Sequence, residues 1–202
     1  MEKPVDKYNI MVIGDENVGK TTILERYFNR KFNSERKKTI GVEYYLKSYT
    51  QKEKNLLYNL KFWDTAGQEK FQSVTRNYYQ RSHGMLITMA INIRSSFSNL
   101  KMWINSIYDG SSLSDLPIVV ICNKCDLEDQ RQVSNNEIEK FCKEEKLKVF
   151  FTSAKNGSNI DEAFDYIINK VIDKNSSNSN SKKSRFELKD DLSDKSTSNC
   201  GC

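Results

Sequence analysis

An eight-residue stretch near the start of the chain carries the pattern G-x-x-x-x-G-K-[ST], which is typical of phosphate binding. The stretch is GDENVGKT, residues 14–21, and it follows the apolar run Ile10–Ile13. A glycine loop between a strand and a helix points several backbone N–H groups into one concavity, and the helix N-terminus adds partial positive charge. We expect Lys20 to reach the outer phosphates and the Thr21 hydroxyl to ligate Mg²⁺. The residues predicted to bind phosphate are Gly14, Asn17, Val18, Gly19, Lys20, Thr21 and Thr22.

A second group of candidate residues follows the apolar segment 56–63, in the stretch DTAGQE. A carboxylate that ends a strand is expected to hold a nucleotide-bound magnesium through water, and Asp64 has that place. The backbone N–H of Gly67 can approach a terminal phosphate, and the Gln68 carbonyl can orient a water molecule. Thr39, in the loop after the first predicted helix, offers a second hydroxyl ligand. The predicted metal ligands are therefore Thr21, Thr39 and Asp64, and the predicted catalytic residues are Lys20 and Gln68.

Two further polar motifs indicate which base the nucleotide carries. They are NKCD at residues 123–126 and SAK at residues 153–155, each directly after an apolar segment. A carboxylate at Asp126 can accept two hydrogen bonds from the N1–H and the exocyclic amine of guanine, whereas adenine has no such donor pair. These motifs disfavour an adenine-nucleotide P-loop enzyme, such as a small kinase, which is the alternative for the phosphate loop alone. The predicted guanine-binding residues are Asn123, Lys124, Asp126, Ser153, Ala154 and Lys155.

The elements that must position these residues alternate between strand-like and helix-like segments. Strands that are apolar throughout and separated by helices indicate a mostly parallel sheet with helices on both faces. We expect an α/β fold of the P-loop NTPase type, with six strands and one antiparallel edge strand. In such sheets ligands bind at the carboxyl ends of the strands, where the motifs lie. The expected strands are 8–13, 42–49, 56–63, 85–91, 118–122 and 149–152, and the expected helices are 20–28, 97–108, 134–145 and a final helix from about 159.

Length and composition predict one domain with a tail. The 202 residues divide into an N-terminal extension at 1–7, a nucleotide-binding domain at 8–173 and a tail at 174–202. The tail has no Trp, Tyr, Val or Ile and is rich in Ser, Asn and Lys, so we expect it to be disordered. A formal net charge of +5 is too small to argue for nucleic-acid binding. No run of 18 apolar residues is present, so no membrane-spanning helix is expected.

The cysteines do not indicate a disulfide framework or a metal centre. Their number, five, is odd, and the chain otherwise has the composition of a cytosolic protein. Cys122 and Cys125 have metal-ligand spacing, but the chain has a single histidine and no second cysteine pair nearby. Four zinc ligands are therefore hard to assemble.

The motifs together resemble those of the small GTPases of the Ras superfamily. GDENVGKT, WDTAGQE, NKCD and SAK carry this likeness, and TIGVE, KFWDTAGQEKF and the pair Tyr78-Tyr79 resemble the Rab family in particular. The likeness covers about residues 7–173. It implies a protein that binds GTP and GDP with Mg²⁺, hydrolyses GTP slowly and acts as a molecular switch in vesicle trafficking. It also implies an effector surface at Ile40, Gly41, Val42, Tyr44, Trp63 and Tyr78.

The resemblance also implies partners and a location. Members of the family meet an exchange factor, a GTPase-activating protein, a GDP-dissociation inhibitor, an escort protein and effectors, and a monomer is expected. The final residues, Cys200-Gly201-Cys202, match the C-x-C ending on which both cysteines receive geranylgeranyl groups. Two prenyl groups would hold the chain on the cytoplasmic face of an intracellular membrane, from which it cycles with the cytosol.

The chain departs from the family pattern at a position close to the terminal phosphate. Glu16 stands where relatives usually carry a small residue. A carboxylate there can repel the phosphate or obstruct an arginine finger, and this motivates a second hypothesis of a GTP-binding module with impaired hydrolysis that serves as an effector scaffold. Arg36 is a candidate for an arginine that acts within the chain, although a solvated loop charge explains it equally well. Tyr44 replaces the usual Phe, which is a smaller departure.

Overall fold

The computed structural model describes residues 7–33, 39, 41–51, 56–65, 78–110 and 115–190, with the backbone alone for residue 110 and residues 177–190. Its centre is a six-stranded sheet with the strand order β2-β3-β1-β4-β5-β6. β2 pairs antiparallel with β3, and the other neighbouring strands pair in parallel. The predicted mostly parallel sheet with one antiparallel edge strand is therefore confirmed. The strands are β1 Lys7–Ile13, β2 Val42–Gln51, β3 Leu56–Thr65, β4 Gly84–Ala90, β5 Ile118–Asn123 and β6 Lys148–Phe151.

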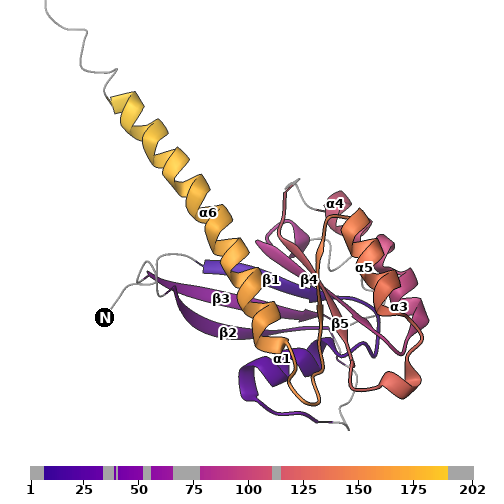
Figure 1. Ribbon diagram of the computed structural model, residues 1–202. Coiled ribbons are helices and arrows are strands. Elements are labelled where there is room, and N and C mark those ends of the chain that lie inside the picture. Colours follow the sequence, from indigo (N-terminus) through magenta and orange to yellow (C-terminus); the bar gives the residue numbers. More distant parts are fainter. Residues whose placement is uncertain are drawn as a thin grey trace, which may run out of the picture.

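Helices cover both faces of this sheet (Figure 1). Because side chains alternate along a strand, Ile10 and Val12 of β1 join one core while Met11 and Ile13 join the other. Buried residues of α1 and α6 complete the first core, and those of α4 and α5 complete the second. The helices are α1 Lys20–Asn29, α3 Arg94–Ser98, α4 Leu100–Gly110, α5 Asn135–Glu144 and α6 Ile160–Asp190, with a 3₁₀ turn, η2, at Glu128–Gln130.

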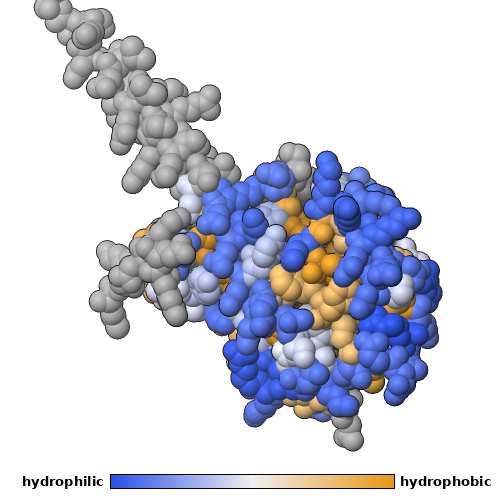
Figure 2. All heavy atoms as spheres, viewed as in Figure 1, coloured by the Kyte–Doolittle hydropathy of each residue, from blue (hydrophilic) through white to orange (hydrophobic). Residues whose placement is uncertain are grey.

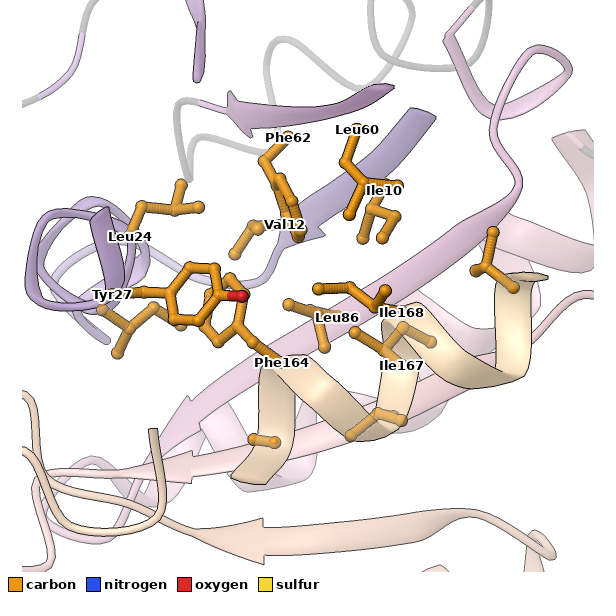
Figure 3. Close-up of a cluster of buried hydrophobic side chains, with 14 of the residues drawn as sticks. Ile10, Val12, Leu24, Tyr27, Leu60, Phe62, Leu86, Phe164, Ile167 and Ile168 are labelled. Atoms are coloured by element: carbon orange, nitrogen blue, oxygen red, sulfur yellow. The ribbon is translucent and has the colours of Figure 1, made fainter. Parts of the chain in front are cut away.

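The first core fixes the helix that follows the phosphate loop. Figure 3 shows the Tyr27 ring of α1 lying against Phe164 of α6, and the two ring centroids are 4.0 Å apart. Phe62 of β3 packs against both rings, and Leu24 is fully buried beside them. Burial of a large apolar side chain contributes about 1.5–3 kcal/mol, so this cluster holds α1 firmly between the sheet and α6. The start of α1, and with it the phosphate loop, is thereby fixed relative to the sheet.

Hydrophilic residues dominate the face of the molecule seen in Figure 2, and apolar residues gather there between α6 and α5. Within the described ranges, no helix is both long enough and apolar enough to cross a membrane.

The region predicted as one helix at 97–108 contains two helices. Regular structure begins earlier, at Arg94, because the Ser96 hydroxyl donates to the Ile93 carbonyl (2.7 Å) and closes a local turn. α3 ends before Asn99 and α4 begins after it. The Asn99 amide donates to the Asp15 carboxylate (2.7 Å), a contact across the fold that helical periodicity does not reveal.

The final helix is longer than the sequence predicts. α6 runs to Asp190, past Lys174, where the predicted disordered tail begins, and Figure 1 shows it projecting beyond the sheet. Extending a helix from a packed stem is much easier than nucleating one, and Ile160–Ile172 provides that stem in the core. The packed part of α6 thus ends near the predicted boundary at residue 173, while the helical backbone continues.

Candidate functional site

The phosphate loop has a backbone shape that requires glycine at two positions. Gly14 has a φ of 132° and Gly19 a φ of 97°. A Cβ atom at Gly14 would lie 2.1 Å from the Thr88 carbonyl oxygen, and one at Gly19 would lie 2.4 Å from the Asn123 amide nitrogen. α1 begins directly after the loop at Lys20, so its N-terminus faces the same concavity. A loop of this shape at a helix N-terminus is suited to bind an anion, and the phosphate-binding role of its residues stays a prediction.

Lys20 is buried at the centre of this loop. Its ammonium donates to the carbonyl oxygens of Gly14 (2.9 Å) and Asp15 (2.6 Å). Burial lowers the pKa of Lys20 to about 8, although the carboxylates of Asp64, Asp15 and Glu16 act in the opposite direction. A bound phosphate would favour the charged form further, because it brings negative charge to a site with little water.

The loop is tied to the neighbouring helix through the Asp15 carboxylate. One of its oxygens accepts from the Asn99 amide (2.7 Å) and the other from the Trp103 indole N–H (2.7 Å). Both donors lie at or in α4, so the Asp15 carboxylate attaches the loop to that helix. The motif did not predict this contact.

Three oxygen-bearing side chains meet beside Lys20. The Thr21 hydroxyl lies 2.9 Å from the Thr39 hydroxyl and donates to the Asp64 carboxylate (2.5 Å). They come from α1, from the loop before β2 and from β3, which the sheet brings together. Mg²⁺ prefers such oxygen ligands, so the residues present fit the predicted metal. Gly67 and Gln68 lie outside the described residues, and their roles stay predictions.

The other end of the site is organised by Asn123, at the end of β5. Its amide nitrogen donates to the Val18 carbonyl (2.9 Å), and its amide oxygen accepts from the backbone N–H of Ala154 (3.2 Å). One side chain therefore joins the phosphate loop to both predicted base-binding motifs. The Asp126 carboxylate accepts from the Ser153 hydroxyl (2.6 Å), which fixes its direction. Burial lowers the pKa of Lys124, and the Asp126 carboxylate opposes that shift.

Arg26 of α1 supports the SAK loop, and sequence reasoning missed it. Its Nε donates to the Ala154 carbonyl (2.6 Å) and its Nη2 to the Lys155 carbonyl. A basic residue on the polar side of a helix normally faces solvent, so nothing in the local pattern indicated this role.

These motifs line one cavity of about 520 Å³, which is within the range of small-molecule sites. The phosphate-loop end and the predicted base-binding end are thus parts of the same hollow. Sequence reasoning missed Phe32, Asn33, Thr65 and Leu127 in its wall, and a half-exposed aromatic after a helix, Phe32, was the one recognisable signal. The lining residues are Glu16, Asn17, Gly19, Lys20, Thr21, Thr22, Phe32, Asn33, Thr39, Thr65, Asn123, Lys124, Asp126, Leu127, Ala154 and Lys155.

The predicted aromatic surface lies on β2 and β3 at the sheet face of the second core, against which Trp63 and Tyr78 pack. The Tyr44 and Trp63 ring centroids are 5.6 Å apart, and those of Trp63 and Tyr78 are 5.2 Å apart. Gly41 and Val42 lead into β2 beside them. Three other predicted site residues, Ile40, Cys200 and Cys202, lie outside the described residues.

Comparison with known proteins agrees with this geometry. The model of the Ras family matches residues 9–173. Ras-related protein Rab-13 of Rattus norvegicus is 34% identical over 195 residues, which cover 95% of this chain and 94% of that protein. Ras-related protein Rab-8B of Homo sapiens is 38% identical over 78% of this chain and 74% of that protein. Ras-related protein Rab-2B of Dictyostelium discoideum is 39% identical over 85% and 83%, respectively. The chain therefore belongs to the Ras family and is a Rab-type small GTPase, a P-loop protein that binds GTP and hydrolyses it.

Proposed function

We propose that this chain is a membrane-anchored guanine-nucleotide switch in vesicle trafficking. The observation that carries the proposal is the single cavity that joins Lys20 and Thr21 at one end to Asp126 and Lys155 at the other. In this proposal the phosphate groups occupy the loop at Gly14–Thr22, and the base lies between the NKCD and SAK motifs. The Asp126 carboxylate selects guanine because it accepts from two donors that adenine does not present together.

Hydrolysis follows from positioning and charge. Lys20 and the loop N–H groups stabilise the negative charge that develops on the β- and γ-phosphates. Thr21 and Thr39 would ligate Mg²⁺ directly and Asp64 would hold it through water, and the metal would neutralise further phosphate charge when bound. Gln68 orients the attacking water, and the Gly67 N–H meets the terminal phosphate. No arginine is among the cavity's described lining residues, so we expect a rate on the order of 10⁻⁴ s⁻¹ until a partner supplies one.

The switch depends on the γ-phosphate. Thr39 joins the metal site to the segment that leads through Ile40 and Gly41 into β2, so loss of the phosphate releases that segment and the one that follows Gly67. Effectors read the GTP-bound form at Ile40–Val42 and at the aromatic surface. An exchange factor, a GTPase-activating protein, a GDP-dissociation inhibitor and an escort protein complete the cycle.

A second candidate function is a GTP-binding scaffold with impaired hydrolysis. It is supported by Glu16, which is one of the residues lining the cavity and whose charge acts on Lys20. A carboxylate near the γ-phosphate opposes the charge that builds up during hydrolysis.

Single-turnover GTP hydrolysis by the full-length chain, Glu16→Ser and Gln68→Leu separates the two functions. For the switch we expect slow hydrolysis by the unmodified chain, and a loss of about tenfold or more in Gln68→Leu with GDP affinity retained. We expect Glu16→Ser to raise the rate. Hydrolysis that appears only after Glu16→Ser would favour the scaffold, and an unchanged rate in Gln68→Leu would contradict the role of Gln68.

A further inference from the structure

The pairing of β2 with β3 places a half-buried cation, Lys61, within the aromatic surface. Tyr44 lies opposite Trp63, and Leu46 lies opposite Lys61. Directly opposite residues of an antiparallel pair share one face of the sheet, so these four side chains form a block on the face of the second core. Leu46 is 68% exposed and Tyr44 is 54% exposed. The block is therefore open to a partner.

The position of the Lys61 ammonium is fixed by two rings. Its Nζ lies 3.8 Å from the ring centroids of both Tyr44 and Trp63, well inside the range of cation–π attraction. The Trp63 ring is held in turn, because its indole N–H donates to the Asn9 side chain (3.3 Å) and the Tyr78 ring packs against it (5.2 Å between centroids). The positive charge is thus seated at a defined place between aromatic faces.

Lys61 has no acidic partner in the part of the chain that the structure describes. Lys47, on the opposite face of β2, makes a useful contrast. It lies 3.7 Å from the centroid of the Tyr27 ring. Burial lowers the pKa of Lys47, and the carboxylates of Asp165 and Asp161 oppose that shift. Lys47 thus has carboxylates nearby, whereas none of the described carboxylates forms an ion pair with Lys61.

We propose that the surface formed by Tyr44, Leu46, Lys61, Trp63 and Tyr78 binds a protein segment that presents one carboxylate among apolar side chains. A partner that covers this surface removes water from the Lys61 ammonium, and aromatic rings alone do not replace it. A carboxylate satisfies the charge, and apolar neighbours cover the rings and Leu46. An anionic membrane surface fits less well, because lipid recognition uses clusters of basic residues and this block has one. The inference rests on the proposed function, in which this surface meets effectors.

Selection of binders from a displayed library of helical miniproteins tests the inference. The targets are the full-length chain loaded with a non-hydrolysable GTP analogue, Lys61→Gln and the control Lys148→Gln. Lys148 carries the same charge and also lies over a ring, that of Phe150 at 5.4 Å, but on the strand at the opposite edge of the sheet. Each selected acidic residue is then replaced by its amide, and affinity is measured against all three targets.

We expect binders of the unmodified chain and of Lys148→Gln to share an acidic residue. Its replacement by the amide should weaken binding to those two targets about tenfold or more, but binding to Lys61→Gln less than about threefold. If the amide replacement weakens binding to all three targets equally, the inference is overturned. It is also overturned if the chain binds phosphatidylserine vesicles through Lys61 and no binder with a shared acidic residue is selected. Binders that prefer the GTP-analogue form but lack the acidic residue would overturn this inference and leave the proposed function standing. Binders that do not distinguish GTP-analogue from GDP loading would count against the proposed function.

Discussion

A single hydrogen at Gly14, in place of a side chain, allows the phosphate loop to approach β4. A Cβ there would lie 2.1 Å from the Thr88 carbonyl oxygen, and the backbone φ is 132°. Gly14→Ala should therefore lower the free energy of unfolding by more than the roughly 1–3 kcal/mol expected from backbone strain alone. Urea denaturation measures the loss. Gly157→Ala is the control, since Gly157 also has a positive φ (88°) but its Cβ would meet only Arg26 at 3.8 Å. Equal losses in the two variants would contradict the clash.

At this scale, the residues that the sequence could identify are those whose partners are near in the chain or belong to a strong motif. Gly14, Lys20 and Asp126 were predicted because their spacing is itself the chemical pattern. Arg26 and Trp103 were missed because their partners, Ala154 and Asp15, lie far away in the sequence and are brought close by the sheet.

At the scale of elements, an ion pair between Glu137 and Arg94 connects the first turn of α5 to α3. Ser134 and Glu137 form a capping box at the start of α5, and Glu137 also accepts from Arg94 of α3 (2.8 Å). The Arg94 hydrogen bond and those from Ser134 lower the pKa of Glu137 to about 2.

This shift predicts a pH-dependent contribution to stability. The pKa in the folded chain is below the ordinary value of 4.5, so the unfolded chain binds more protons between pH 4.5 and about 2. The stabilising contribution is therefore complete above pH 4.5 and is lost as the pH falls toward 2. Glu137→Gln should be less stable than the unmodified chain at about pH 6, and the difference in urea midpoint should shrink as the pH falls through this window. A difference in urea midpoint that stays constant with pH would contradict the lowered pKa of Glu137.

The elements themselves were largely predictable, because strands that are buried on both sides have a strong apolar pattern. The break at Asn99 was not predicted, and the side chain there contacts Asp15 of the phosphate loop, a residue far away in the sequence. The extension of α6 to Asp190 was also missed, since Ser and Asn have little helix preference and a helix continues there from a packed stem.

At the scale of the whole molecule, the proposed function requires the tail to connect the described domain to a membrane. A single lipid chain can give only marginal and reversible anchoring, with about 0.8 kcal/mol for each buried methylene, and a stable anchor needs a second signal. The basic residues Lys182, Lys183 and Arg185 are followed by four acidic ones, so the tail offers little electrostatic help.

We therefore expect Cys200→Ser or Cys202→Ser to weaken membrane association in the native cell, and the double variant to be recovered in the soluble fraction. Fractionation and intact-mass analysis measure this, with two prenyl additions expected on the unmodified chain. A chain that stays on membranes with neither cysteine modified would refute the anchor.

The central claim, that the ends of the strands form a guanine-nucleotide site, is tested most directly by changing Asp126→Asn and measuring affinity for GDP and for xanthosine diphosphate. The amide cannot accept from both guanine donors, and it can donate to the oxygen that xanthine carries instead of the amine. The account predicts that GDP binding weakens by roughly 2–3 kcal/mol, or about 30- to 150-fold, while xanthosine diphosphate binding becomes stronger. Unchanged GDP affinity in Asp126→Asn, with no gain for xanthosine diphosphate, would contradict it.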